Sequence, residues 1–260
     1  GFQIGAGRKL TWPDDYFAIR GLYQLSKDEE SLPTSEHGTN PVILVPHEGI
    51  MSRLTLVLRR NDTDVPTFPN RGSIFEVVPE VAGLGGDYMY LKGTIRYDWY
   101  FPLFWKFVLA YKSKFGVVSK LPWADKLVIS RWDLYNVGGV YSDGTLRGYP
   151  EYTFGGRNNP EKGITMLAMS SAVRFPVLEQ QLYLSLFTDM GNTWASVAEM
   201  DPTDLYHGVG FGVRLMIPML GLMGFDFAWR LDDPDRTPFE NDAGTGADRF
   251  EFHFLLNKGF

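Results

Sequence analysis

Apolar and polar residues alternate with a period of two along almost the whole of this 260-residue chain. In residues 223–231 every odd position is large and apolar, whereas the even positions are Gly224, Asp226, Ala228 and Arg230. Successive side chains of a β-strand point to opposite faces, so this pattern predicts strands with one apolar and one polar face. It leaves little room for amphipathic helices, which need a period near 3.6.

The alternating segments predict an all-β, antiparallel fold of about eleven strands. Seven segments are clear and four are weaker: 53–59, 91–99, 105–114, 181–190, 208–217, 223–232 and 249–260, then 2–10, 16–25, 73–81 and 164–175. Short connections (11–15, 102–103, 176–180, 218–221) alternate with long ones (27–49, 119–162, 193–205, 232–247), and 61–72 is intermediate. Short turns on one side and long loops on the other are typical of outer-membrane barrels.

Two folds fit this alternation, and they place the apolar face differently. In a soluble sandwich used for binding, the apolar face would be the core. In a transmembrane barrel it would meet lipid, and the polar face would line the interior. The sequence favours the barrel, because large aromatic residues crowd the apolar face and resemble an interfacial girdle. We expect Tyr97, Trp99 and Phe101 to face Trp105 and Phe107 across a short turn.

Composition narrows the function further. The chain has no cysteine, which excludes disulfides and thiolate metal sites, and its net charge of -6 argues against nucleic-acid binding. Its four histidines are scattered, and the acidic residues between 232 and 248 match no EF-hand loop. We therefore expect no metal, no cofactor and no catalytic residues: the protein is not predicted to be an enzyme.

Five local motifs carry a family resemblance. They are Leu146-Arg147-Gly148-Tyr149, Phe187-Thr188-Asp189-Met190-Gly191, the turns at 12–16 (WPDDY) and 68–72 (FPNRG), and the terminal segment 252–260 (FHFLLNKGF). Their types and order resemble the barrel of BamA-type outer-membrane assembly proteins. The resemblance implies location in the bacterial outer membrane, a lipid-bilayer environment, unfolded outer-membrane proteins as substrates, and accessory lipoproteins as partners.

The resemblance also implies two sets of functional residues. In the first, the loop 119–162 inserts into the lumen, where Arg147, Gly148 and Tyr149 meet Phe187, Asp189 and Gly191. In the second, the last strand forms one side of a lateral seam that opens and captures substrate strands by strand addition. The residues of this terminal strand are Phe250, Phe252, Phe254, Leu256 and Phe260.

The contact between Arg147 and Asp189 also has a physical basis. Asp189 shares the parity of the polar face, and a bidentate arginine–carboxylate bond in a low-dielectric interior would fix an otherwise mobile loop. The family's second acidic partner aligns with Ala172, so we expect a lock with one carboxylate. Arg174, on the same strand face, is expected to compete for Asp189. Taken without the family, Arg147 would be read as a solvated loop arginine.

Eleven strands do not complete such a barrel. Because the family has about sixteen strands, and single-chain barrels have an even number, we expect this chain to be the C-terminal part, without roughly the first five strands and the periplasmic domains before them. A related protein-secretion barrel or a passive outer-membrane pore is the alternative function.

Overall fold

The computed structural model describes residues 1–29, 43–44, 48–156, 162–232 and 249–256. Phe260 and the predicted acidic loop after Asp232, as far as residue 248, lie outside these ranges. Within them, no helix is long and apolar enough to cross a membrane.

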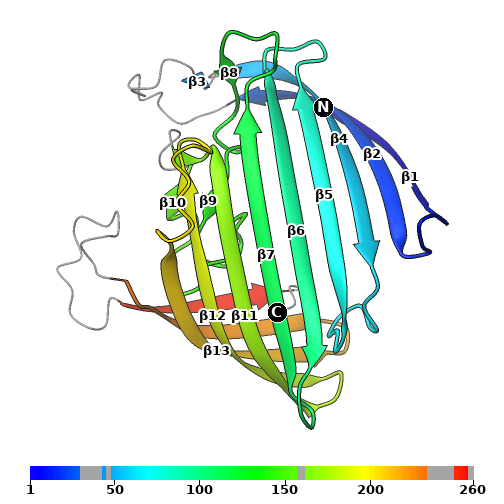
Figure 1. The fold of residues 1–260 in the computed structure, drawn as a ribbon, viewed down its shortest axis with the longest axis vertical. Helices are drawn as coiled ribbons and strands as arrows, with labels where there is room; N and C mark the ends of the chain where they lie inside the picture. Colours follow the sequence, from blue (N-terminus) through cyan, green and yellow to red (C-terminus); the bar gives the residue numbers. More distant parts are fainter. Residues whose placement is uncertain (30–42, 45–47, 157–161, 233–248, 257–260) are drawn as a thin grey trace.

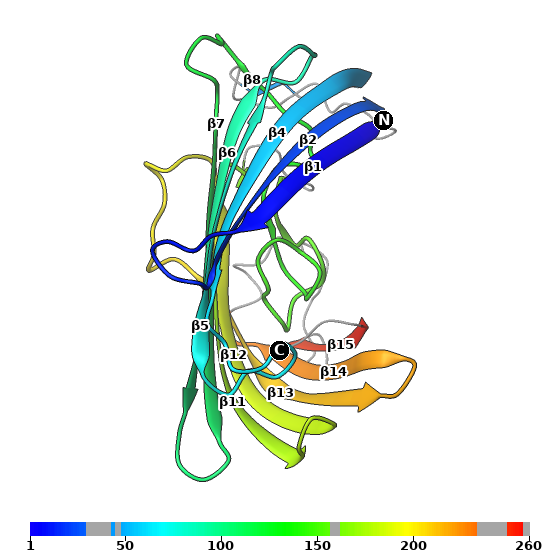
Figure 2. The same cartoon turned by 90° about the vertical axis from the view of Figure 1, so that its right-hand side faces the viewer.

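Eleven strands form one antiparallel sheet, as the alternation predicts. Their order in the sheet follows the chain: β1 (Phe2–Lys9), β2 (Phe17–Glu29), β4 (Glu48–Asn61), β5 (Gly72–Ala82), β6 (Tyr90–Pro102), β7 (Val108–Ser119), β11 (Thr165–Leu178), β12 (Leu182–Trp194), β13 (Tyr206–Ile217), β14 (Gly221–Arg230) and β15 (Phe250–Leu256). The sheet curves strongly but does not close, and its edges are β1 and β15 (Figures 1 and 2).

The two faces of this curved sheet differ as a membrane barrel requires. On β12, Leu184 and Leu186 point outward and are 43% and 68% exposed, whereas Asp189 points inward and is 0% exposed. On β13 and β14 likewise, the outward residue Phe211 is exposed and the inward residue Asp226 is buried. A soluble sandwich would bury the apolar face instead. The barrel prediction is therefore confirmed, and the sandwich is excluded.

The turns follow the predicted alternation with one correction. The connections at 103–107, 179–181 and 218–220 are short, and they join neighbouring antiparallel strands. We expected a strand from Trp105, but β7 begins at Val108, because Trp105 has a φ of 54° and lies in the turn. The rings of Trp105 and Phe107 each lie 5.1 Å from the ring of Phe175 on the neighbouring strand β11.

The connection between β7 and β11 lies on the concave side of the sheet (Figure 2). It contains β8 (Leu127–Val128), β9 (Asn136–Val137) and β10 (Phe154–Gly155); β9 pairs with β10, and β8 pairs with β3 (Ile43–Leu44). Its apolar side chains pack with inward residues of the strands in one buried cluster, which includes Leu134, Tyr135, Val137, Leu146, Tyr149, Tyr88, Tyr90 and Met166. The described part of this connection thus occupies part of the interior of the curved sheet, and we call it the inserted loop (residues 120–156 and 162–164).

Candidate functional site

Arg147 of the inserted loop is bound to the inner face of β12. Its Nε and Nη2 donate to the two carboxylate oxygens of Asp189 over 2.7 and 2.8 Å, and its main-chain N–H donates to the same carboxylate over 3.0 Å. The side chains of Arg147 and Asp189 are 5% and 0% exposed. Such a charge-assisted, bidentate bond away from water is among the stronger polar contacts in proteins.

A second carboxylate completes the site, which corrects the expectation of one. Nη1 of Arg147 donates to Asp226 of β14 over 3.3 Å. Asp226 in turn receives two bonds from Arg214 of β13, over 2.6 and 2.8 Å. The two arginines and two aspartates therefore form a neutral network, which offsets the cost of burying each charge. Burial lowers the pKa of Arg147, but the two carboxylates outweigh it and hold that pKa above its usual value.

The spacing of Phe187, Asp189 and Gly191 follows from the period of the strand. All three face inward on β12, where Phe187 and Asp189 meet Arg147 of the inserted loop and Gly191 lies beside Val137. The Phe187 ring lies under the guanidinium of Arg147, with Cζ 3.3 Å from the ring centroid. A Cβ on Gly191 would come within 3.0 Å of Val137, so glycine leaves room for the loop.

Gly148 and Tyr149 dock the loop against the next strands. Gly148 has a φ of 95°, and a Cβ there would lie 2.8 Å from the main chain of Trp229 on β14. Its N–H donates to Nε2 of His253 on β15 over 3.3 Å. Tyr149 is fully buried and donates to Asp232 over 2.6 Å. Burial, followed by that bond, raises the pKa of the Tyr149 phenol.

The inward glycines of β13 provide the space for this docking. A Cβ on Gly208 would stand 1.9 Å from the carbonyl oxygen of Arg147. A Cβ on Gly210 would reach the ring of Phe187 at 2.6 Å, and one on Gly212 would reach the carboxylate of Asp226 at 2.3 Å. These glycines therefore leave a bare strand face, which admits the loop at Gly208 and the buried network at the next two positions.

Known proteins resemble this chain in sequence and in fold. The model of the Omp85 superfamily domain matches residues 4–260. The chain belongs to the Omp85 superfamily. Outer membrane protein assembly factor BamA of Neisseria meningitidis serogroup B is 27% identical over 158 residues, which are 56% of this chain and 19% of that protein.

A solved relative has the same fold. The structure of BamA from Haemophilus ducreyi lacking POTRA domains 1–3 superposes with a TM-score of 0.68 at 18% identity, over 97% of this chain and 52% of the other. The Omp85 chain described here thus spans about half of that solved chain. Both likenesses group this barrel region with BamA-type proteins of the bacterial outer membrane.

Arg174 does not compete for Asp189 in this Omp85 barrel, contrary to expectation. Its guanidinium donates to the carbonyl oxygen of Pro69 and lies 5.0 Å from the centroid of the Tyr100 ring. Pro69 belongs to the turn between β4 and β5, which folds inward so that Phe68 stacks on Tyr183 at 4.0 Å. The inward turn thus holds Arg174 away from the Arg147 network.

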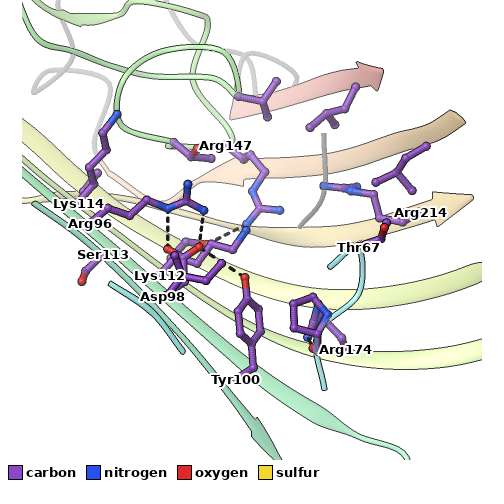
Figure 3. A pocket seen from close by; sticks show the side chains of 18 of the residues that line it. Thr67, Arg96, Asp98, Tyr100, Lys112, Ser113, Lys114, Arg147, Arg174 and Arg214 are labelled. Carbon is purple, nitrogen blue, oxygen red and sulfur yellow. Dashed lines mark hydrogen bonds and ion pairs between the residues drawn. The ribbon is translucent and has the colours of Figure 1, made fainter. Parts of the chain in front are cut away.

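A charged cavity of about 770 Å³ adjoins the Arg147 network in the Omp85 barrel (Figure 3). Arg96 and Tyr100 both bond Asp98 in its wall. Its lining carries seven basic and four acidic side chains: Arg59, Arg96, Lys112, Lys114, Arg147, Arg174 and Arg214, with Glu76, Asp98, Asp143 and Asp226. The interior beside the loop is therefore polar and carries an excess of positive charge.

One main-chain edge of the terminal strand β15 faces away from β14. Leu231 N donates to His207 O, so the odd residues of β14 bond β13 and the even ones bond β15. Because Asp226 pairs with His253, the odd residues of β15 use their main-chain groups on β14. In the described part of the chain no other strand adjoins β15. The residues whose main-chain groups face away from β14 also point their side chains outward: Phe250, Phe252, Phe254 and Leu256, each at least 38% exposed.

The site includes residues that the sequence alone did not identify. Asp226 and Arg214 were assigned to the polar strand faces, but nothing in their spacing linked them to Arg147. Ser170 of β11 also joins the network, because it receives a bond from Nη2 of Arg147 over 3.1 Å and donates to Asp189 over 2.6 Å. The inward parity of these residues was the available signal, and the curvature that brings them together was not.

Proposed function

We propose that this chain is the barrel part of an assembly factor that folds and inserts β-barrel proteins into the bacterial outer membrane. The observation that carries the proposal is the curved antiparallel sheet with an outward apolar face, whose terminal strand β15 turns Phe250, Phe252 and Phe254 outward. Membership of the Omp85 superfamily and the likeness to an outer membrane protein assembly factor support it.

The mechanism follows from the cost of an open sheet edge in lipid. Unpaired N–H and C=O groups have no water to bond in the bilayer core, so an extended segment that pairs with them is favoured. A lateral seam beside β15 would thus capture a substrate strand by strand addition. Main-chain bonds make capture tolerant of sequence, while the alternating outward aromatics of β15 match a strand that also turns apolar residues to lipid.

The proposal names partners and needs no covalent chemistry. The bilayer covers the outward apolar face, unfolded outer-membrane proteins are the substrates, and accessory lipoproteins assist. The Arg147 network would serve as a loop lock, since it holds the inserted loop against β12, β13 and β14 while the seam works.

Reconstitution of the full-length protein in liposomes tests this function. A urea-unfolded outer-membrane barrel protein is added, and its folding is followed by resistance to protease and by altered gel mobility without heating. Faster folding than in empty liposomes is expected. Equal folding rates with and without the protein would contradict the proposal. Export of one dedicated partner would then indicate a secretion barrel, and ion conductance alone would indicate a pore.

A proline substitution tests the role of the edge. Phe252→Pro removes an N–H from the edge of β15 that faces away from β14 and leaves the bonds to β14 in place, because those use the odd residues. We expect most assembly activity to be lost while the barrel stays folded. Phe252→Ile keeps the N–H and should show a much smaller loss. Similar losses in the two variants would contradict strand addition at this edge.

A further inference from the structure

The turn between β4 and β5 folds across the inner face of the sheet and contacts strands far from its own. Phe68 of this turn is 3% exposed and stacks on Tyr183 of β12, with ring centroids 4.0 Å apart. Leu222 of β14 belongs to the same buried cluster. Since β6, β7 and β11 separate β5 from β12 in the sheet, the turn joins parts of the barrel that are not neighbours.

The base of the turn is closed by its own hydrogen bonds. The Asp64 carboxylate accepts the N–H of Asn70 over 2.9 Å, and the N–H of Asp64 donates to the carbonyl oxygen of Arg71 over 3.2 Å. Gly72 permits the close approach of the two legs, because it has a φ of 103° and a Cβ there would lie 2.5 Å from the carbonyl oxygen of Asp62. The family motif at this position thus closes a turn that presents its aromatic ring to the interior.

A charged hydrogen bond also ties the turn to β11. Nη2 of Arg174 donates to the carbonyl oxygen of Pro69, and the Tyr100 ring of β6 supports the guanidinium at 5.0 Å from the ring centroid. Hydrogen bonds with a charged donor are among the stronger ones in proteins. The turn is thus held from β11, β12 and β14, and none of these strands is an edge of the sheet.

The turn bounds the charged cavity on the periplasmic side. The strands β4, β6, β11 and β13 run in one direction, because they occupy every second place in the antiparallel sheet. The connection after β4 therefore lies at the same end as the short turns 103–107, 179–181 and 218–220, and short turns face the periplasm in outer-membrane barrels. Three residues of the turn line the cavity at this end: Pro66, Thr67 and Pro69.

The inserted loop lines the same cavity from another side. It follows β7, which runs opposite to β4, so it enters from the other end of the sheet. Its residues in the lining are Val140, Ser142, Asp143, Thr145 and Arg147. Figure 3 shows Arg147 of the loop and Thr67 of the turn in separate parts of the cavity wall. An ion that crosses this cavity from end to end meets both elements.

We propose that the turn of residues 62–72 is a second barrier to ion flow through the barrel, in series with the inserted loop. Resistances in series add, so displacing one element leaves the other in the path. The turn therefore keeps the membrane sealed while the loop is displaced, and the loop does so while the turn is displaced. This role concerns the permeability of the barrel and goes beyond strand capture.

The conductance of the full-length protein in planar bilayers tests the barrier. Phe68→Ala removes the ring that packs on Tyr183, and Arg147→Ala releases the loop. Each single variant should conduct modestly more than the wild type, and the double variant severalfold more than either. Phe104→Ala is the matched control, because that ring lies in the turn between β6 and β7 and is 75% exposed. Combined with Arg147→Ala, it should add nothing.

A double variant of Phe68→Ala and Arg147→Ala that conducts no more than Arg147→Ala alone would overturn the barrier. Asp64→Ala covers the case in which Phe68→Ala does not fold, because Asp64 is exposed and closes the turn from outside the buried cluster. Barrel folding is checked by gel mobility without heating. Asp64→Ala should also raise conductance severalfold in the Arg147→Ala background, and no rise in that folded double variant would equally overturn the barrier.

Discussion

Arg147 lies over the ring of Phe187, with Cζ 3.3 Å from the ring centroid, while its nitrogens bond two carboxylates. One face of the planar guanidinium thus meets an aromatic ring, and its edge meets aspartates from two strands. An ammonium group has neither the plane nor the fork of donors that this site uses. The geometry selects arginine and not merely a positive charge.

Arg147→Lys should therefore release the loop nearly as well as Arg147→Ala. Removing one partner of a buried ion pair costs about 3–5 kcal/mol, because the remaining charge stays buried. Chymotrypsin cleavage after Tyr135 of the inserted loop, which is 1% exposed and precedes Asn136, measures the release in the reconstituted full-length protein. Assembly in a cell that depends on the variant should fall with it; unchanged outer-membrane protein levels would show that the lock is dispensable.

A charge swap between Arg147 and Asp189 should rescue poorly. Arg147→Asp places a carboxylate beside Asp226, and Asp189→Arg removes the acceptor of Ser170. The new carboxylate at position 147 and the carboxylate of Asp226 then repel each other in a buried site. Adding Asp226→Asn to the double variant should restore part of the protease resistance, and a swap that recovers fully by itself would contradict the role of Asp226.

Gly208→Ala should displace the loop although it alters no charge. The new methyl would stand 1.9 Å from the carbonyl oxygen of Arg147, which is main chain and has little freedom to move. Gly21→Ala on β2 is the matched control, because nothing lies within 4 Å of the methyl there. Protease sensitivity of the loop should increase in the first variant only, and resistance in both would place the loop elsewhere.

Asp133→Asn should be tolerated, in contrast to changes at Asp189. Asp133 bonds Arg53 over 2.7 Å, but burial raises the pKa of this carboxyl despite the arginine. An acid whose pKa is raised on folding contributes stability below its unfolded pKa, and this contribution is lost as the pH rises through the folded value. The side chain introduced by Asp133→Asn is neutral at every pH, so this loss of stability does not occur, and its amide oxygen still accepts a hydrogen bond from Arg53. Loop protection at neutral pH should match the wild type, and a loss as large as in Asp189→Asn would contradict this.

Loop release should open an anion-preferring path. The cavity beside the lock has seven basic and four acidic side chains, and Arg147→Ala still leaves six basic ones against the same four. In planar bilayers, the variant should conduct more than the wild type. The sign of its reversal potential in a potassium chloride gradient should show that chloride permeates more readily than potassium. Cation preference would show that other residues govern the path.

The strands were predictable because their signal is local. Each strand carries its own alternation, so all eleven were found from residue types alone. The start of β7 was misplaced because the turn before it contains Phe104 and Trp105, whose apolar side chains continue the pattern although the backbone at Trp105 does not. Alternation reports which face a side chain takes and not whether its strand is paired.

The site was less predictable because it depends on curvature. The alternation in residues 223–231 indicates that Asp226 faces inward, but only the bend of the sheet brings β14 opposite Arg147. The roles of Arg147, Asp189 and the terminal strand in assembly remain predictions that the experiments above address.

The Arg147 network has a consequence for how the barrel forms. Its members come from β11, β12, β13 and β14, and each faces inward only in the observed register. A slip of one residue in β12 would turn Asp189 toward lipid and present Thr188 or Met190 to the loop. We therefore expect the complete set of loop contacts to form only once these four strands have aligned in this register, so that a docked loop marks a correctly assembled sheet.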